Sequence, residues 1–139
     1  MLQFYIKRVK ILNFTKGCDS TDQHYCSTSS NLHDLLVGHS RINHNDACLS
    51  YIFTYQYLSD NTLGLSWIGS IADEGGVCAR FHEVLEDGKV EWQSHNTGVI
   101  NFAYNNRELP SQVAKLALAH EIGHSLGSPV SSYFYYILQ

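Results

Sequence analysis

The stretch His120-Glu121-Ile122-Gly123-His124 decides how the fold of this chain is predicted. Two histidines at positions i and i+4 share one face of a helix, so both imidazoles can reach a single metal ion. A glutamate between two such histidines is typical of zinc hydrolases, where it acts as general base toward a water molecule at the metal. The motif therefore predicts a helix with His120 and His124 as zinc ligands and Glu121 as the catalytic residue.

The residues after this motif continue a longer zinc-protease pattern, H-E-x-x-H-x-x-G-x-x-H, as far as its last position. Gly127 matches the glycine of the pattern, whereas Val130 stands where a third histidine ligand is expected. A catalytic zinc normally has three protein ligands and one open position for water. A replacement ligand would come from upstream, where each histidine fits a loop or surface position better than a metal site. These histidines are His24, His33, His39, His44, His82 and His95.

Length and composition indicate one small domain. The chain has 139 residues, of which 44% are hydrophobic, and this is enough for a single core. A net charge of −4 and a pI near 6.0 argue against a nucleic-acid partner. The sequence has no run of 18 apolar residues, so we expect no membrane span, and residues 1–8 lack the pattern of a signal peptide.

The cysteines suggest an extracellular ancestry. Cys18, Cys26, Cys48 and Cys78 allow three full pairings, and the sequence does not choose among them. Their spacing matches no zinc ribbon and no redox C-x-x-C motif. A glycosylation acceptor at Asn13-Phe14-Thr15 agrees with an oxidising compartment.

Hydrophobic patterning predicts strands alternating with helices. The predicted strands are residues 4–12, 48–54, 63–69 and 99–104. The almost wholly apolar 48–54 is expected to be central, and the alternation in 99–104 indicates a half-exposed strand. Residues 13–30 are polar and predict a surface loop, while 70–97 predict a long connection with a short strand at 89–92.

Two helices are expected. Residues 31–37 have helical apolar spacing after a capping Ser30 or Asn31 and end near Gly38. Pro110 opens the second helix in its first turn. The side chains predicted to share one side of that helix are Val113, Leu116, Ala117, His120 and His124.

Taken together, these segments resemble the catalytic domain of the ADAM proteins (a disintegrin and metalloprotease, adamalysin-type metzincins). The branch that they resemble most is the Kuzbanian or α-secretase branch. The similarity runs with gaps from about Phe4 to Pro129. The stretches that carry it are His120 to Pro129, Asn96 to Ile100, Leu109-Pro110, Phe4 to Ile11, His44 to Leu49, Phe53 to Gln56, Thr62 to Gly69 and Gly75 to Cys78.

The resemblance implies an α/β fold, a partial metzincin upper subdomain. In it a twisted mixed sheet with an antiparallel edge strand is backed by helices, one of which carries the zinc motif. The strand at 63–69 is the implied edge strand, and the main chain of Leu63 and Gly64 would pair with an extended peptide substrate. An edge strand offers N–H and C=O groups at the spacing that another strand needs. An ordinary core strand is the alternative.

The resemblance also implies what this chain lacks. Residues 1–129 correspond to a metalloprotease (peptidase M12B-like) domain truncated at both ends, and residues 130–139 are a divergent tail. The methionine of the family's Met-turn is missing, since Met1 is the only methionine. Family partners of Cys48 and Cys78 fall outside the matched region, so both are expected to remain thiols.

The implied function is that of a zinc metalloendopeptidase of the ectodomain-shedding type. Its substrates would be proteins, in particular membrane-protein ectodomains, at the cell surface or in the secretory pathway. With two of three zinc ligands present and Val130 at the third position, this chain is expected to be an incomplete and inactive fragment. The alternative is a non-catalytic remnant that acts as a binding or decoy module.

Overall fold

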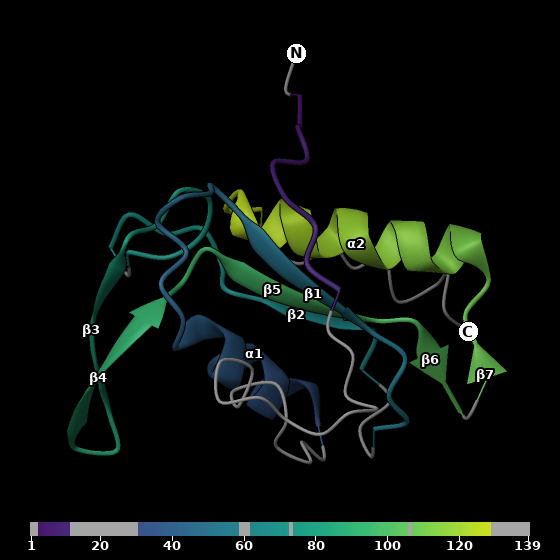
Figure 1. The fold of residues 1–139 in the computed structure, drawn as a ribbon, viewed down its shortest axis with the longest axis horizontal. Helices are drawn as coiled ribbons and strands as arrows, with labels where there is room; N and C mark the ends of the chain where they lie inside the picture. The colour runs from purple at the N-terminus through teal and green to yellow at the C-terminus, as the bar shows by residue number, and fades with distance from the viewer. Residues whose placement is uncertain (1–2, 12–30, 59–61, 73, 106, 129–139) are drawn as a thin grey trace.

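A computed structural model of the chain describes residues 3–11, 31–58, 62–72, 74–105 and 107–128. Within them a three-stranded sheet lies between two helices, as Figure 1 shows. The mixed sheet with its antiparallel edge confirms the predicted α/β class. Several sequence predictions lie outside the described residues, namely the 13–30 loop, the glycosylation acceptor, Cys18, Cys26, His24 and the 130–139 tail.

The sheet has the strand order β1-β5-β2. Strand β1 (Ser50–Thr54) runs parallel to β5 (Thr97–Asn101), and β2 (Gly64–Ser66) runs antiparallel to β5 on its other side. Every residue of β5 is buried, whereas β1 is only partly buried. The predicted central position of 48–54 and the half-exposed character of 99–104 are therefore wrong, because the later strand lies between the other two and is covered on both faces.

Helix α1 (Leu32–Ser40) covers one face of this sheet. The Asn31 side chain accepts a hydrogen bond from the Asp34 amide at 2.9 Å, which makes Asn31 the N-cap, and the helix continues two residues beyond Gly38. Its apolar side chains form the core of the domain with β5. That core consists of Leu32, Leu35, Leu36 and Val99, with Ile52, Leu58, Leu65 and Trp67 packed against it.

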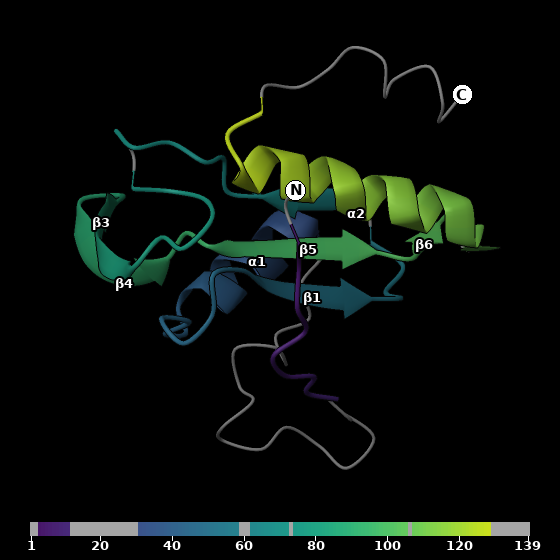
Figure 2. The same cartoon turned by 90° about the horizontal axis from the view of Figure 1, so that it is seen from above.

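Helix α2 (Ser111–Ser125) covers the opposite face and runs antiparallel to β5 (Figures 1 and 2). Its buried strip is Ala117, Glu121 and Ser125. The side of α2 that faces the sheet is therefore rotated from the predicted side. The small side chains of Ala117 and Ser125 allow the helix to pack closely on the sheet, and the two motif histidines lie half-buried beside this strip. Pro110 stands just before the first helical residue.

The predicted long connection 70–97 contains a hairpin of β3 (Phe81–Glu86) and β4 (Lys89–Ser94). Asp87 and Gly88 form its turn with φ of 49° and 76°, a conformation that favours glycine and aspartate. The hairpin projects from one end of the sheet (Figures 1 and 2). At the other end, β6 (Ala103–Tyr104) and β7 (Arg107–Glu108) form a small second hairpin.

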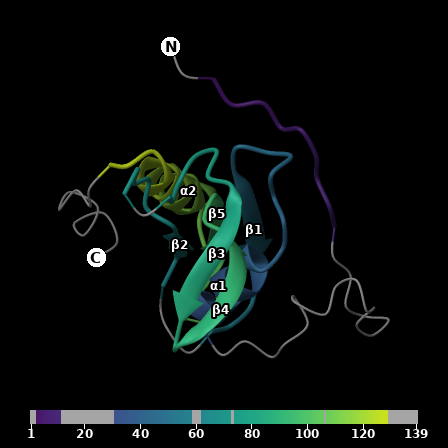
Figure 3. The same ribbon diagram turned by 90° about the vertical axis from the view of Figure 1, so that its left-hand side faces the viewer.

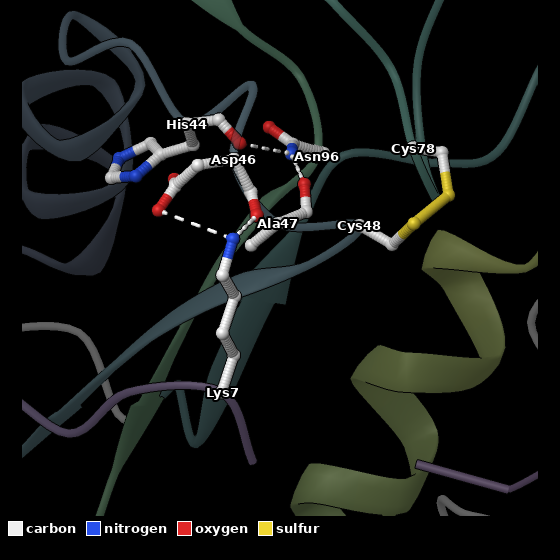
Figure 4. The surroundings of a disulfide bond; sticks show 7 residues. All are labelled: Lys7, His44, Asp46, Ala47, Cys48, Cys78 and Asn96. Carbon is white, nitrogen blue, oxygen red and sulfur yellow. Dashed lines mark hydrogen bonds and ion pairs between the residues drawn. A yellow bond between two sulfur atoms is a disulfide. The ribbon is translucent and has the colours of Figure 1, made fainter. Parts of the chain in front are cut away.

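Two further predictions are wrong. Residues 3–11 belong to no strand, because no described strand pairs with them. They run outside the layered body (Figures 1 and 3). Cys48 and Cys78 are joined in a disulfide instead of remaining thiols. The loop before β1 and the segment after Gly76 meet near the end of α2, which brings the two cysteines together (Figure 4).

Candidate metal centre

The end of helix α2 fixes the position of the second motif histidine. Gly127 has φ of 86°, its amide bonds the His124 carbonyl at 2.8 Å, and the Ser128 amide bonds the Gly123 carbonyl at 2.9 Å. These two bonds are those of a Schellman motif, in which a left-handed glycine ends the helix. The glycine of the zinc-protease pattern therefore stops the helix just beyond His124.

The two motif histidines converge on each other. The Nε2 atoms of His120 and His124 lie 3.0 Å apart, and the ring planes are almost perpendicular at 84°. The Nδ1 atom of His124 lies 3.2 Å from the Ser128 carbonyl, so Nδ1–H donates there and the Nε2 lone pair faces His120. Burial, together with the nearby His124, lowers the pKa of His120, which favours the neutral form that binds metals.

This pair fits a shared zinc ion. Zinc–nitrogen bonds of about 2.0–2.1 Å in a tetrahedral site place two ligand nitrogens about 3.3 Å apart. The observed 3.0 Å separation requires a shift of only a few tenths of an ångström. Within the described part of the chain no group of three His, Cys, Asp or Glu residues forms a metal site, and Val130 lies outside that part.

Glu121 lies on the sheet side of α2 and is only 6% exposed. Its Oε2 lies 2.8 Å from the Ser66 hydroxyl, and its own carbonyl lies 2.9 Å from the same hydroxyl, which can donate to either. Burial raises the pKa of the Glu121 carboxyl, while the Ser66 hydrogen bond and His124 act in the opposite direction. A carboxyl held in this way can accept and release a proton closer to neutral pH than an exposed one.

The predicted substrate strand lies directly beside this carboxylate. A Cβ at Gly64 would come within 2.6 Å of Glu121 Cγ, so only glycine lets β2 pack this closely on the helix. The Leu63 carbonyl accepts from the Asn101 amide at 2.8 Å. Because main-chain groups alternate direction in antiparallel pairing, the N–H and C=O of Gly64 face the outer edge of the sheet.

The other described histidines are placed elsewhere. His39 Nε2 lies 3.0 Å from the Ser50 hydroxyl, and His44 Nε2 lies 3.1 Å from the His39 carbonyl. His82 and His95 pack edge to face at the base of the β3–β4 hairpin, and His33 lies exposed on α1. None of them belongs to the group formed by the motif residues.

The sequence analysis missed a polar network beneath Glu121. Ser66 holds the carboxylate, and the Tyr51 hydroxyl lies 2.8 Å from the Ser125 hydroxyl. Burial raises the pKa of Tyr51. The period of two along a strand places Ser66 on the same face as Gly64, and that pattern could have identified it. No sequence pattern indicates that Tyr51 reaches across the sheet to α2.

Comparisons with known proteins indicate the family of the chain. The sequence model described as Metallo-peptidase family M12 matches residues 2–129. "Disintegrin and metalloproteinase domain-containing protein 10" of Xenopus laevis is 34% identical over 132 residues, covering 94% of this chain and 17% of the relative. The homologue of that name in Caenorhabditis elegans is 33% identical over 138 residues, covering 92% and 15%. The Homo sapiens protein is 33% identical over 132 residues, covering 94% and 17%. The chain thus spans about a sixth of the length of these relatives.

Proposed function

Because the chain belongs to metallo-peptidase family M12, we propose that it carries the zinc helix and the substrate edge strand of a zinc-dependent endopeptidase. The observation that carries the proposal is the convergence of His120 and His124 Nε2 at 3.0 Å next to the buried Glu121. His120 and His124 would hold the metal. Zinc at this position supplies a Lewis acid that polarises a peptide carbonyl and acidifies water.

The chain's own residues would move the proton and align the substrate. Glu121 takes up the proton from water and passes it to the leaving amine, with Ser66 fixing one carboxylate oxygen. The outer edge of β2 receives an extended protein segment by strand addition, with Gly64 better oriented than Leu63 to pair with it.

In the part of the chain that the structure describes, no helix is both apolar and long enough to span a bilayer.

The substrate class follows from the resemblance to the relatives and remains part of the proposal. We propose protein substrates, in particular ectodomains of membrane proteins, at the cell surface or in the secretory pathway. The Cys48–Cys78 disulfide supports such a location, because disulfides persist in oxidising compartments.

Val130 is the observation that favours a second candidate function. Its side chain has no donor atom at the position where the family pattern has a ligand. We therefore expect the purified 139-residue chain to bind zinc weakly and to cleave no peptide. A binding or decoy module without catalytic activity would have these properties.

A Val130→His variant tests the proposal, with Val130→Ala as the matched control that adds no donor. Outer-shell partners of metal ligands are worth about 10- to 100-fold in affinity, so a restored ligand should tighten zinc binding by at least about 100-fold in calorimetric titration. Equal zinc affinity in the two variants would contradict a metal site at His120 and His124.

The same background separates binding from catalysis. Adding Glu121→Gln to Val130→His should retain the gain in zinc affinity and abolish any cleavage of a quenched fluorescent peptide. If the Val130→His chain binds zinc tightly but cleaves no peptide, the decoy function is favoured over the peptidase function.

A further inference from the structure

The β3–β4 hairpin, which extends beyond the sheet and both helices (Figures 1 and 2), presents apolar side chains to solvent. Its register places Leu85 opposite Val90, and Glu83 opposite Trp92. Because side chains alternate along a strand, both pairs lie on the same face, and Phe81 joins them with its ring 5.4 Å from that of Trp92. Leu85 is 73% exposed, Val90 63% and Trp92 51%. We call this set of side chains the hairpin face.

The opposite face of the hairpin is turned toward the body of the domain. Arg41 at the end of α1 pairs with Glu91 of β4 at 2.8 Å. At the base of the hairpin, the His82 ring packs edge to face on His95, with ring centroids 4.7 Å apart. These contacts hold the hairpin with its apolar face outward. Contiguous exposed apolar side chains of this kind mark surfaces that bind a partner.

A carboxylate stands in the middle of the hairpin face. Glu83 is exposed, lies between Phe81 and Leu85 along β3, and faces Trp92 across the strand pair. Among the residues that the structure describes, no cation pairs with it. A positive side chain bound here would meet both a carboxylate and an indole ring, the surroundings that arginine prefers. The net charge of −4 also favours a cationic partner.

The size of the hairpin face favours a short segment over a second copy of the chain. A stable dimer buries about 800 Å² on each partner, with about 20–30 residues a side. The hairpin face offers far fewer side chains. An extended segment fits it better, because residues two apart in an extended chain are spaced about 6.5–7 Å, the same repeat that separates Phe81, Glu83 and Leu85 along β3.

We propose that the hairpin face binds an extended segment of a partner protein in which an arginine stands between two apolar residues, each two positions away. The guanidinium pairs with Glu83 beside the Trp92 ring. The two apolar side chains cover Phe81 on one side and the Leu85–Val90 pair on the other. This binding needs no metal at His120 and His124, so it is independent of the proposed function.

An NMR titration of the full chain tests the proposal. The probe is the peptide Ser-Leu-Ser-Arg-Ser-Leu-Ser with both ends blocked, and its control has Glu in place of Arg. The arginine peptide should bind with a dissociation constant on the order of 1 mM, and its chemical-shift changes should be confined to residues 81–94. The glutamate peptide should bind at least about fivefold more weakly. Equal binding of the two peptides, no binding, or shift changes outside the hairpin would overturn the proposal.

Variants on the exposed surface locate the recognition. Glu83→Gln should weaken binding of the arginine peptide about fivefold, whereas Asp87→Asn removes the same charge at the turn and should leave it unchanged. Glu83→Lys should bind the glutamate peptide in preference to the arginine peptide. Equal losses in Glu83→Gln and Asp87→Asn would refute a specific pairing, since only the overall charge would then matter.

Two other occupants of the hairpin face are outcomes of a further variant. Leu85→Ser should weaken binding of the arginine peptide about tenfold, because a leucine side chain is no longer buried. A dimer of the unmodified chain in sedimentation equilibrium that Leu85→Ser dissociates would overturn the proposal in favour of a second copy. Binding to phosphatidylcholine vesicles that Leu85→Ser abolishes would overturn it in favour of a lipid surface. We expect the unmodified chain to do neither.

Discussion

Two histidine pairs in this molecule have almost the same ring separation and opposite surroundings. The ring centroids of His39 and His44 lie 4.3 Å apart, and those of His120 and His124 lie 4.5 Å apart. In the first pair Nε2 atoms meet a serine hydroxyl and a carbonyl, whereas in the second pair they meet each other. Proximity of the rings alone therefore does not make a histidine pair a candidate metal site, because the ring nitrogens must also converge.

Burial separates the pairs further. His39 is only 4% exposed at the end of α1, and burial, together with the nearby His44, lowers its pKa to about 3. The Ser50 hydrogen bond opposes this shift. His39 is thus a neutral part of the core, while the half-buried pair on α2 has its nitrogens in position for a ligand.

The largest expected effect that separates the two pairs is on metal affinity. His120→Ala and His124→Ala should each weaken Zn²⁺ binding by at least about 100-fold, since each removes a ligand and not merely an outer-shell partner. His39→Gln should leave the affinity unchanged. Calorimetric titration of the three variants measures this, and weaker binding in His39→Gln alone would reverse the assignment of the pairs.

The helix that carries the motif could be predicted from sequence because its pattern is local. The spacing of His120 and His124 alone places both rings on one helical side. Gly127 matched only the glycine of the zinc-protease pattern, and the structure adds its role as the left-handed residue that ends the helix. The antiparallel edge at Gly64 came from the resemblance and not from the pattern. The structure adds the reason for the glycine, which is the Glu121 side chain packed against it.

The errors concern features that depend on contacts between distant segments. An apolar strand such as 48–54 is central only if another strand pairs with its outer edge, and its sequence does not show that β5 is the middle strand. The strand predicted in residues 4–12 also depends on a partner strand, and its sequence does not show that no described strand pairs with residues 3–11. The Cys48–Cys78 bond joins residues 30 positions apart, and four cysteines leave their pairing open.

A second prediction concerns acid stability and the buried pair. The pKa of His39 is depressed in the folded state, so below the unfolded value of 6.5 the unfolded chain takes up a proton that the folded chain excludes. Stability is therefore full above pH 6.5 and falls as the pH drops toward 3. Between pH 7 and pH 5 this residue should lower the free energy of unfolding by about 2 kcal/mol.

Urea unfolding at the two pH values measures this loss. His39→Gln should remove most of it, while His33→Gln at an exposed position of the same helix should retain it. His44, whose pKa burial also lowers, contributes in the same direction, so His44→Gln should reduce the loss as well. An unchanged pH dependence in His39→Gln would show that other groups cause the acid sensitivity.

The smallest expected effect concerns the helix that carries His39. The Asn31 side chain caps α1, whereas no side chain caps α2, so Asn31→Ala should cost about 1 kcal/mol and Ser111→Ala at the start of α2 close to nothing. Urea unfolding measures both. Zn²⁺ affinity should be equal in the two variants, because α1 and α2 lie on opposite faces of the sheet. If Asn31→Ala lowered the metal affinity as well, the two histidine pairs would be coupled through β5 and could not be treated as independent regions.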